Sequence, residues 1–271
     1  SQAVRVDAHS LRRENVQRYC YAGPVVFAKP QGNQTSRVPL KAGAEIFGAS
    51  GIAADAEVIG LMLEALQEAK MHAPVLLLGH MGIYLGLVEQ LLAEGRLDET
   101  RRSALFACIQ RKGASDIRDL LDDSPTAAML AALPDLMGDI DIFNSAGEVL
   151  QQAPESVLAA LQELQELSAM VKARYPQVDL RIDVSELSGY GYHNGPVFAV
   201  YHPQHGSALA QGGRYDGVGD VFGRGRAATG FDMNLKQLMA SAFEQQGAYF
   251  APYTADESQA ELAVFVKTLR D

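Results

Sequence analysis

Residues 187–218 read LSGYGYHNGPVFAVYHPQHGSALAQGGRYDGV, and this stretch sets the fold class. The apolar runs at residues 196–202 and 207–212 predict two strands, and the Pro-Gln-His-Gly segment between them favours a hairpin turn. Two glycine-containing segments, residues 189–195 and 212–217, flank this hairpin. The stretch therefore predicts an antiparallel pair of strands with glycine-rich backbone at both ends.

The rest of the chain carries further strand and helix signals without a regular βαβ alternation. Strands are predicted at residues 19–27, 38–48, 75–79 and 178–184, and helices at residues 53–70 and 234–246. Residues 82–174 read as short helical pieces followed by a long helix over 155–174, which we interpret as a helical insertion. The predicted fold class is α+β, with an antiparallel sheet flanked and interrupted by helices.

The composition is typical of a folded protein with one large or two small domains. Of its 271 residues, 48% are hydrophobic and 21% are charged, which is enough for a full-sized core. The net charge of −10 argues against a dedicated nucleic-acid or membrane-surface binder. Cys20 and Cys108 are too few for a disulfide framework, so we expect a cytoplasmic protein. No apolar run approaches the ~20 residues that span a bilayer.

Common metal-binding and nucleophile patterns are weak or missing. His202 and His205 form an HxxH pair without an adjacent third ligand, so solvated turn histidines are favoured over a metal site. The aspartates at residues 116–123 lack a calcium-loop glycine and are typical of a solvated helix face. No GxSxG motif occurs. The sequence therefore predicts neither a metal nor a cofactor.

The two glycine-containing segments lack Rossmann spacing and a Walker lysine. Turn glycines alone would explain them. However, tyrosines, a histidine and an aspartate stand between the glycines, and such side chains offer oriented donors and acceptors to a small zwitterion. Both interpretations stay open on spacing alone.

Four segments together resemble the catalytic domain of histidyl-tRNA synthetases, which has a class II synthetase fold. Residues 19–48 resemble the second signature motif, residues 187–198 and 212–218 the two histidine-recognition motifs, and residues 229–238 the third signature motif. The resemblance implies one class II synthetase-like domain over residues 1–250 and a C-terminal tail over residues 251–271, with no anticodon-binding domain. Because the chain opens at Ser1 with an element already under way, we expect that the N-terminal part of this fold is missing from it.

The departures from the family's pattern concern ATP. Formation of an aminoacyl adenylate needs fixed cations on the ATP phosphates, and the resemblance places the family's three arginines at Phe27, Ser188 and Gln237. Loss of even one such donor typically costs ~10²–10³ in rate. Adenylate formation is therefore predicted to be lost, and no catalytic residue is predicted.

The amino-acid side of the pocket is better retained. The resemblance implies a histidine-binding site made of Glu45, Tyr190, Tyr192, His193 and Tyr215. Within this site Glu45 is expected to meet the amino group and the aromatic rings to enclose the imidazole. Lys41 replaces a glutamine of the family, which changes the chemistry at that position.

An amino-acid site without an ATP site is typical of a sensor. The chain resembles the regulatory subunits of short-form ATP phosphoribosyltransferases, which are synthetase paralogues. This resemblance implies a non-catalytic protein that self-associates as a dimer, assembles with the short-form catalytic subunit, activates it, and mediates feedback inhibition by L-histidine in histidine biosynthesis. The first alternative is a sensor of amino acids or tRNA in another regulatory complex. The second is an active histidyl-tRNA synthetase, and the missing arginines argue against it.

Overall fold

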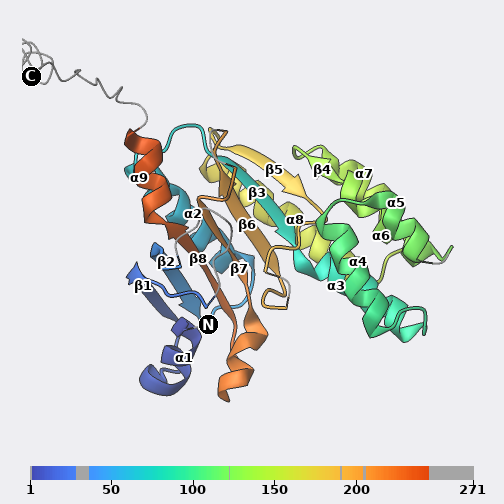
Figure 1. Cartoon of the computed structure of the whole chain (residues 1–271), viewed down its shortest axis with the longest axis horizontal. Coiled ribbons are helices and arrows are strands. Elements are labelled where there is room, and N and C mark those ends of the chain that lie inside the picture. The colour runs from blue at the N-terminus through green and yellow to red at the C-terminus, as the bar shows by residue number, and fades with distance from the viewer. Residues whose placement is uncertain (1, 29–36, 122, 190, 204–205, 244–271) are drawn as a thin grey trace, which may run out of the picture.

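The structure is a computed structural model that describes residues 2–28, 37–121, 123–189, 191–203 and 206–243. Within these ranges the chain forms a mixed eight-stranded sheet with helices packed on it (Figure 1). The strand order is β1-β2-β8-β7-β6-β3-β5-β4. None of the helices in these ranges is long and apolar enough to cross a membrane.

The sheet is antiparallel except for one pair. Its strands are β1 (Gln17–Pro24), β2 (Leu40–Phe47), β3 (Val75–His80), β4 (Met137–Gly138), β5 (Asp179–Asp183), β6 (Pro196–Tyr201), β7 (Ala210–Arg214) and β8 (Ala228–Asn234). β3 and β5 run parallel, and a long helical crossover joins them, as parallel strands require. The predicted antiparallel sheet is thus confirmed apart from this pair.

Helices pack on the sheet and extend beyond its β4 edge (Figure 1). They are α1 (Gln2–Arg5), α2 (Ile52–Glu68), α3 (Met81–Ala93), α4 (Glu99–Gln110), α5 (Ala114–Leu120), α6 (Pro125–Ala132), α7 (Ile142–Val149), α8 (Glu155–Arg174) and α9 (Leu235–Phe243), with a π-helix η1 (Val6–Leu11) and 3-10 turns η2 (Leu133–Asp135) and η3 (Asp216–Phe222). α2 and α8 contact the sheet and each other, and α3 packs on α8.

The core lies between the sheet and these helices. Ile59, Met62 and Leu66 follow the helical period on α2 and are fully or almost fully buried. They join Leu76 and Leu78 of β3, both 0% exposed, in one apolar cluster. Burial of this continuous face fixes α2 against the sheet, and it leaves the opposite face of β2 available for polar residues.

Most predicted elements are present, and the exceptions have a local cause. The strand predicted at residues 207–212 instead runs from Ala210 to Arg214. Helix α7 was not predicted, because its sequence IFNSAGEV contains Asn, Ser and Gly, which are poor helix formers. Strand β8 was also missed, because Gly230, Asp232 and Asn234 are of types that are depleted in strands. The predicted tail at residues 251–271 lies outside the described residues.

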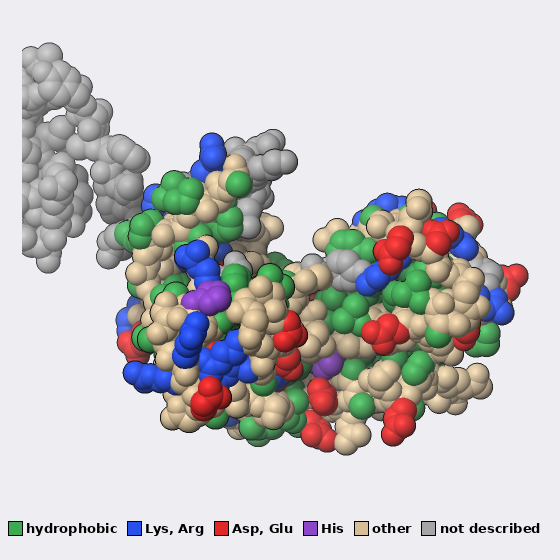
Figure 2. Space-filling model, turned by 90° about the horizontal axis from the view of Figure 1, so that it is seen from below, with side chains coloured by type: hydrophobic (Ala, Val, Ile, Leu, Met, Phe, Trp, Pro, Cys, Tyr) green, Lys and Arg blue, Asp and Glu red, His purple; other side chains and the backbone are tan. Residues whose placement is uncertain are grey.

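Charge is unevenly distributed over the surface. On the face that Figure 2 shows, Lys and Arg side chains form a cluster at one end of the molecule, whereas at the other end they are interspersed with Asp and Glu side chains. Arg12, Arg224 and Arg226 line a cavity of about 780 Å³. Arg224 and Arg226 donate hydrogen bonds to the backbone carbonyls of Arg13 and Asn15. These two arginines therefore hold the N-terminal segment against the loop that precedes β8.

Candidate functional site

Strand β2 is central to the site because its residues alternate between two faces of the sheet. Ala44 and Ile46 belong to the core cluster with α2, so Lys41, Gly43 and Glu45 face the other side. In the register, Glu45 lies opposite Tyr19 of β1 and Gly230 of β8. The acid thus stands on the strand next to the edge of the sheet, between its neighbours β1 and β8.

This face is hollowed into a cavity of about 260 Å³. Four of the predicted site residues line it together, namely Glu45, Tyr192, His193 and Tyr215. The fifth, Tyr190, lies outside the described residues. The other lining residues are Tyr21, Ser188, Gly189, Gln211, Gly212, Gly230, Phe231 and Asp232. Segments that are far apart in the sequence are therefore combined at one place.

Three aromatic rings form a wall of this cavity. The ring centroids of Tyr192 and Tyr215 are 4.8 Å apart, and the His193 ring meets Tyr192 edge-on at 5.2 Å. His193 Nδ1 lies 3.0 Å from the Ser188 carbonyl oxygen, so this nitrogen carries a proton and donates. Burial lowers the pKa of His193, which favours the neutral ring with an acceptor at Nε2. Such a wall suits a flat ligand ring with polar edges.

Glu45 is the acid of this cavity. Burial raises its pKa to about 7, although hydrogen bonds from Tyr215 and Tyr21 act in the opposite direction. The Tyr215 hydroxyl donates to Glu45 Oε2. Burial and the nearby Glu45 also raise the pKa of Tyr21, Tyr192 and Tyr215, so these hydroxyls remain protonated. The cavity therefore offers a carboxyl group that ionises near neutral pH, surrounded by hydroxyl donors.

Two glycines make room for these side chains. A Cβ on Gly230 would lie 1.7 Å from Glu45 Oε2 and 2.7 Å from the Ala44 carbonyl oxygen. Gly189 has a φ of +74°, and a Cβ there would lie 2.1 Å from His193 Nδ1. Only glycine fits both positions without moving a cavity residue.

A second cavity of about 180 Å³ adjoins the first, because Gln211 and Asp232 line both. Phe27 and Gln237, which stand at two of the expected arginine positions, line this second cavity. Ser188, at the third position, lines the first. All three positions therefore border the site, and none of them supplies a cation.

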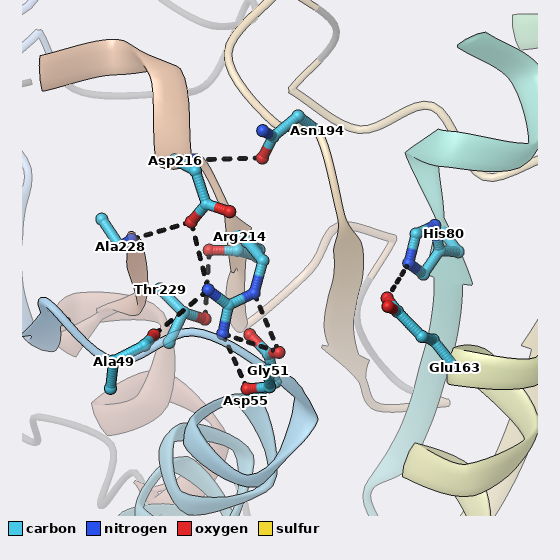
Figure 3. Close-up of polar contacts among 11 residues, drawn as sticks. Ala49, Gly51, Asp55, His80, Glu163, Asn194, Arg214, Asp216, Ala228 and Thr229 are labelled. Atoms are coloured by element: carbon cyan, nitrogen blue, oxygen red, sulfur yellow. Dashed lines mark hydrogen bonds and ion pairs between the residues drawn. The ribbon is translucent and has the colours of Figure 1, made fainter. Parts of the chain in front are cut away.

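Arg214 connects the two glycine-containing segments to α2, a role that the sequence patterns did not reveal. Its guanidinium donates to Asp55 Oδ2 at 3.0 and 2.9 Å, and to the carbonyl oxygens of Gly51 and Ala49 (Figure 3). It also donates to Asp216 Oδ1 at 3.1 Å. The sequence GGRYDG contains both Arg214 and Asp216, but only the structure places Asp55 beside them.

This network continues into the segment at residues 189–195. The backbone N–H of Asp216 donates to Asn194 Oδ1 at 3.1 Å, and Asp216 Oδ1 accepts from the backbone N–H of Ala228 at 2.9 Å (Figure 3). Tyr215 lies between Arg214 and Asp216 in the sequence. The network thus fixes the backbone on both sides of a tyrosine that lines the cavity.

His80 is a second buried polar residue near the site. Its Nδ1 accepts from the backbone N–H of Gly82 at 3.1 Å and thereby caps α3. Its Nε2 lies 3.1 Å from Glu163 Oε2 on α8, and this contact lowers the pKa of Glu163 (Figure 3). His80 therefore joins β3 to α3 and α8.

In the described ranges, no group of three or more His, Cys, Asp or Glu side chains is arranged to hold a metal ion. His202 is described, whereas His205 lies outside the described residues. Within the predicted acidic face, Asp116 pairs with Arg111 at 2.6 Å. Cys20 is exposed and Cys108 is buried, and both are free thiols.

Comparison with known proteins gives a family and a relative. The family model described as histidyl-tRNA synthetase matches residues 1–238. The chain is 44% identical over 245 residues to the ATP phosphoribosyltransferase regulatory subunit of Alkalilimnicola ehrlichii, which is 89% of this chain and 60% of that relative. The chain thus spans about 60% of the length of the curated relatives it matches.

Solved structures show the same fold. One is an ATP phosphoribosyltransferase regulatory subunit/histidyl-tRNA synthetase from Bacillus halodurans, with a TM-score of 0.78 at 23% identity over 99% of this chain and 69% of that chain. Another is a chain of the ATP phosphoribosyl transferase (HisG:HisZ) complex from Thermotoga maritima, with a TM-score of 0.64 at 19% identity over 86% of this chain and 79% of that chain. At these identities the similarity concerns the class II synthetase-like fold.

Proposed function

This chain belongs to the histidyl-tRNA synthetase family, and from that premise we propose that it acts as a regulatory subunit of a short-form ATP phosphoribosyltransferase. In this role it performs no chemistry of its own. It assembles with the catalytic subunit, activates it, and reports the concentration of L-histidine. The name of the relative that is 44% identical to it supports this assignment.

The observation that carries the proposal is the contrast between the two adjoining cavities. The first combines Glu45, His193 and Tyr215, which suit an amino acid with a planar side chain. The second has Phe27 and Gln237 where adenylate formation would need arginines. A site that binds the amino acid but cannot neutralise ATP phosphates suits a sensor better than a synthetase.

L-histidine is proposed to bind in the first cavity. Glu45 would accept hydrogen bonds from the amino group of the ligand, and the rings of Tyr192, His193 and Tyr215 would enclose its imidazole. For feedback inhibition, histidine must bind one state of the complex with the catalytic subunit more tightly than the other state. The free energy of such coupling is typically about 1–3 kcal/mol. Self-association as a dimer and contact with the catalytic subunit belong to the same proposal.

The test is phosphoribosyl-ATP formation by the cognate catalytic subunit, with and without the full-length form of this protein, over a titration of L-histidine. Activity that depends on this protein and falls with histidine supports both parts of the proposal. Glu45→Gln should weaken inhibition, whereas Glu57→Gln on the exposed face of α2 should not. Absence of both activation and a complex on gel filtration would contradict the proposal. Pyrophosphate exchange that depends on histidine would indicate a synthetase instead.

A further inference from the structure

Lys41 stands out in the site because of its charge. Among the described residues that line the two adjoining cavities, it is the one lysine or arginine, whereas Glu45 and Asp232 supply carboxylates. The Lys41 side chain is only 11% exposed. An ammonium group buried to this degree is costly unless it has an anionic partner, and Asp232 Oδ1 accepts a hydrogen bond from its Nζ.

The strand register places this ion pair at the junction of the cavities. Lys41 lies opposite Asn234, and Asp232 lies opposite Gly43, two residues further along β2. Lys41 therefore reaches diagonally along the sheet, across a position that carries no side chain. Asp232 is 32% exposed and lines both cavities. The positive and negative groups are thus side by side where the two cavities meet.

An aromatic ring also restrains the ammonium group of Lys41. Lys41 Nζ lies 5.6 Å from the centroid of the Phe27 ring. This is a cation–π distance, and the ring stands at one of the positions where the resemblance implied an arginine. The ring restrains the lysine without accepting a conventional hydrogen bond from it, so the ammonium N–H groups that do not donate to Asp232 remain available to an anion.

We propose that the Lys41–Asp232 pair binds the charged head group of a free α-amino acid, with Lys41 on its carboxylate and Asp232, together with Glu45, on its ammonium group. This inference rests on the proposed function and adds the recognition of the ligand's two charges. A zwitterion carries its opposite charges side by side, so it can bind across the pair and leave no buried charge without a partner. An amino acid esterified at its carboxyl group lacks the anion that Lys41 requires.

The proposal predicts different effects on the binding of two ligands that differ only in the carboxylate group. L-histidine and histamine share the imidazole and the ammonium group, but histamine has no carboxylate. Isothermal titration calorimetry on the full-length protein would compare both ligands for the wild type, Lys41→Met and the matched control Lys236→Met, whose lysine is exposed on α9. Lys41→Met should weaken L-histidine binding about ten- to hundredfold, the typical effect of losing a charge-assisted hydrogen bond. Histamine binding should not weaken by more than threefold, because histamine has no carboxylate for Lys41 to bind.

The remaining variants test whether the positive charge of Lys41 causes the effect. Lys41→Arg should restore most of the affinity for L-histidine, and Lys236→Met should change neither ligand. Equal losses for both ligands in Lys41→Met, or no loss for L-histidine, would overturn the role of Lys41. If Lys41→Met does not fold, Lys41→Ala carries the same comparison. Absence of L-histidine binding by the wild type would overturn the proposed function itself, and this inference with it.

Discussion

The buried pair between Arg214 and Asp55 leads to the strongest prediction about stability. Asp55→Asn removes the carboxylate that accepts from Nε and Nη2 of Arg214 at 3.0 and 2.9 Å. The two side chains are 7% and 0% exposed, so water cannot replace the lost partner. Because Arg214 also holds the backbone beside Tyr215, the change acts on the site as well as on the fold.

Removing one partner of a buried pair costs about 3–5 kcal/mol when the other charge loses its compensation. Asp216 still pairs with Arg214 at 3.1 Å, so we expect a loss at the lower end of this range. Typical domains are stable by about 5–15 kcal/mol in total, so the loss is a large fraction. Glu57→Gln is the matched control, since Glu57 is on the same helix and also accepts two hydrogen bonds from an arginine, Arg18. That pair is 59% and 45% exposed, and its loss should leave the free energy of unfolding almost unchanged.

Urea unfolding followed by circular dichroism measures the difference. With a slope of about 1–3 kcal/mol per molar urea, the midpoint of Asp55→Asn should fall by at least about 1 M. Arg214→Lys keeps the buried charge but loses the planar fork, so it should give a smaller loss and also serves if Asp55→Asn fails to fold. Equal midpoints for Asp55→Asn and Glu57→Gln would refute the argument that burial decides the strength of these pairs.

Three further predictions concern the site and the core. Because the pKa of Glu45 is raised to about 7, the ionised fraction of its carboxyl group grows about tenfold between pH 6 and 8. The affinity for histidine should therefore rise over this pH range in the wild type, and this rise should be absent in Glu45→Gln. Calorimetric titration with histidine at each pH would measure both. Gly230→Ala should abolish histidine binding, because the new Cβ would lie 1.7 Å from Glu45 Oε2; unchanged affinity by calorimetry would contradict the geometry. Leu78→Ala should cost about 2–5 kcal/mol in urea unfolding, since Leu78 is 0% exposed in the core.

Periodicity in the sequence was sufficient where an element has a continuous apolar pattern. The helix predicted over residues 155–174 coincides with α8, and the strands predicted at residues 19–27 and 38–48 correspond to β1 and β2. Strand β8 could not be predicted in this way, because Gly230 and Asp232 serve the cavity rather than strand propensity. Its place between β2 and β7 depends on long-range pairing.

The sequence by itself determined which chemical groups this protein has at the family's motif positions: an acid at Glu45, aromatic residues at Tyr192 and Tyr215, and no arginine at Phe27 or Gln237. Only the tertiary structure decided which of these groups act together. Tyr215 meets Glu45 across 170 residues of sequence, and Lys41 meets Asp232 across 191. Local patterns cannot encode such contacts, because the register of strands that are distant in sequence places these side chains side by side.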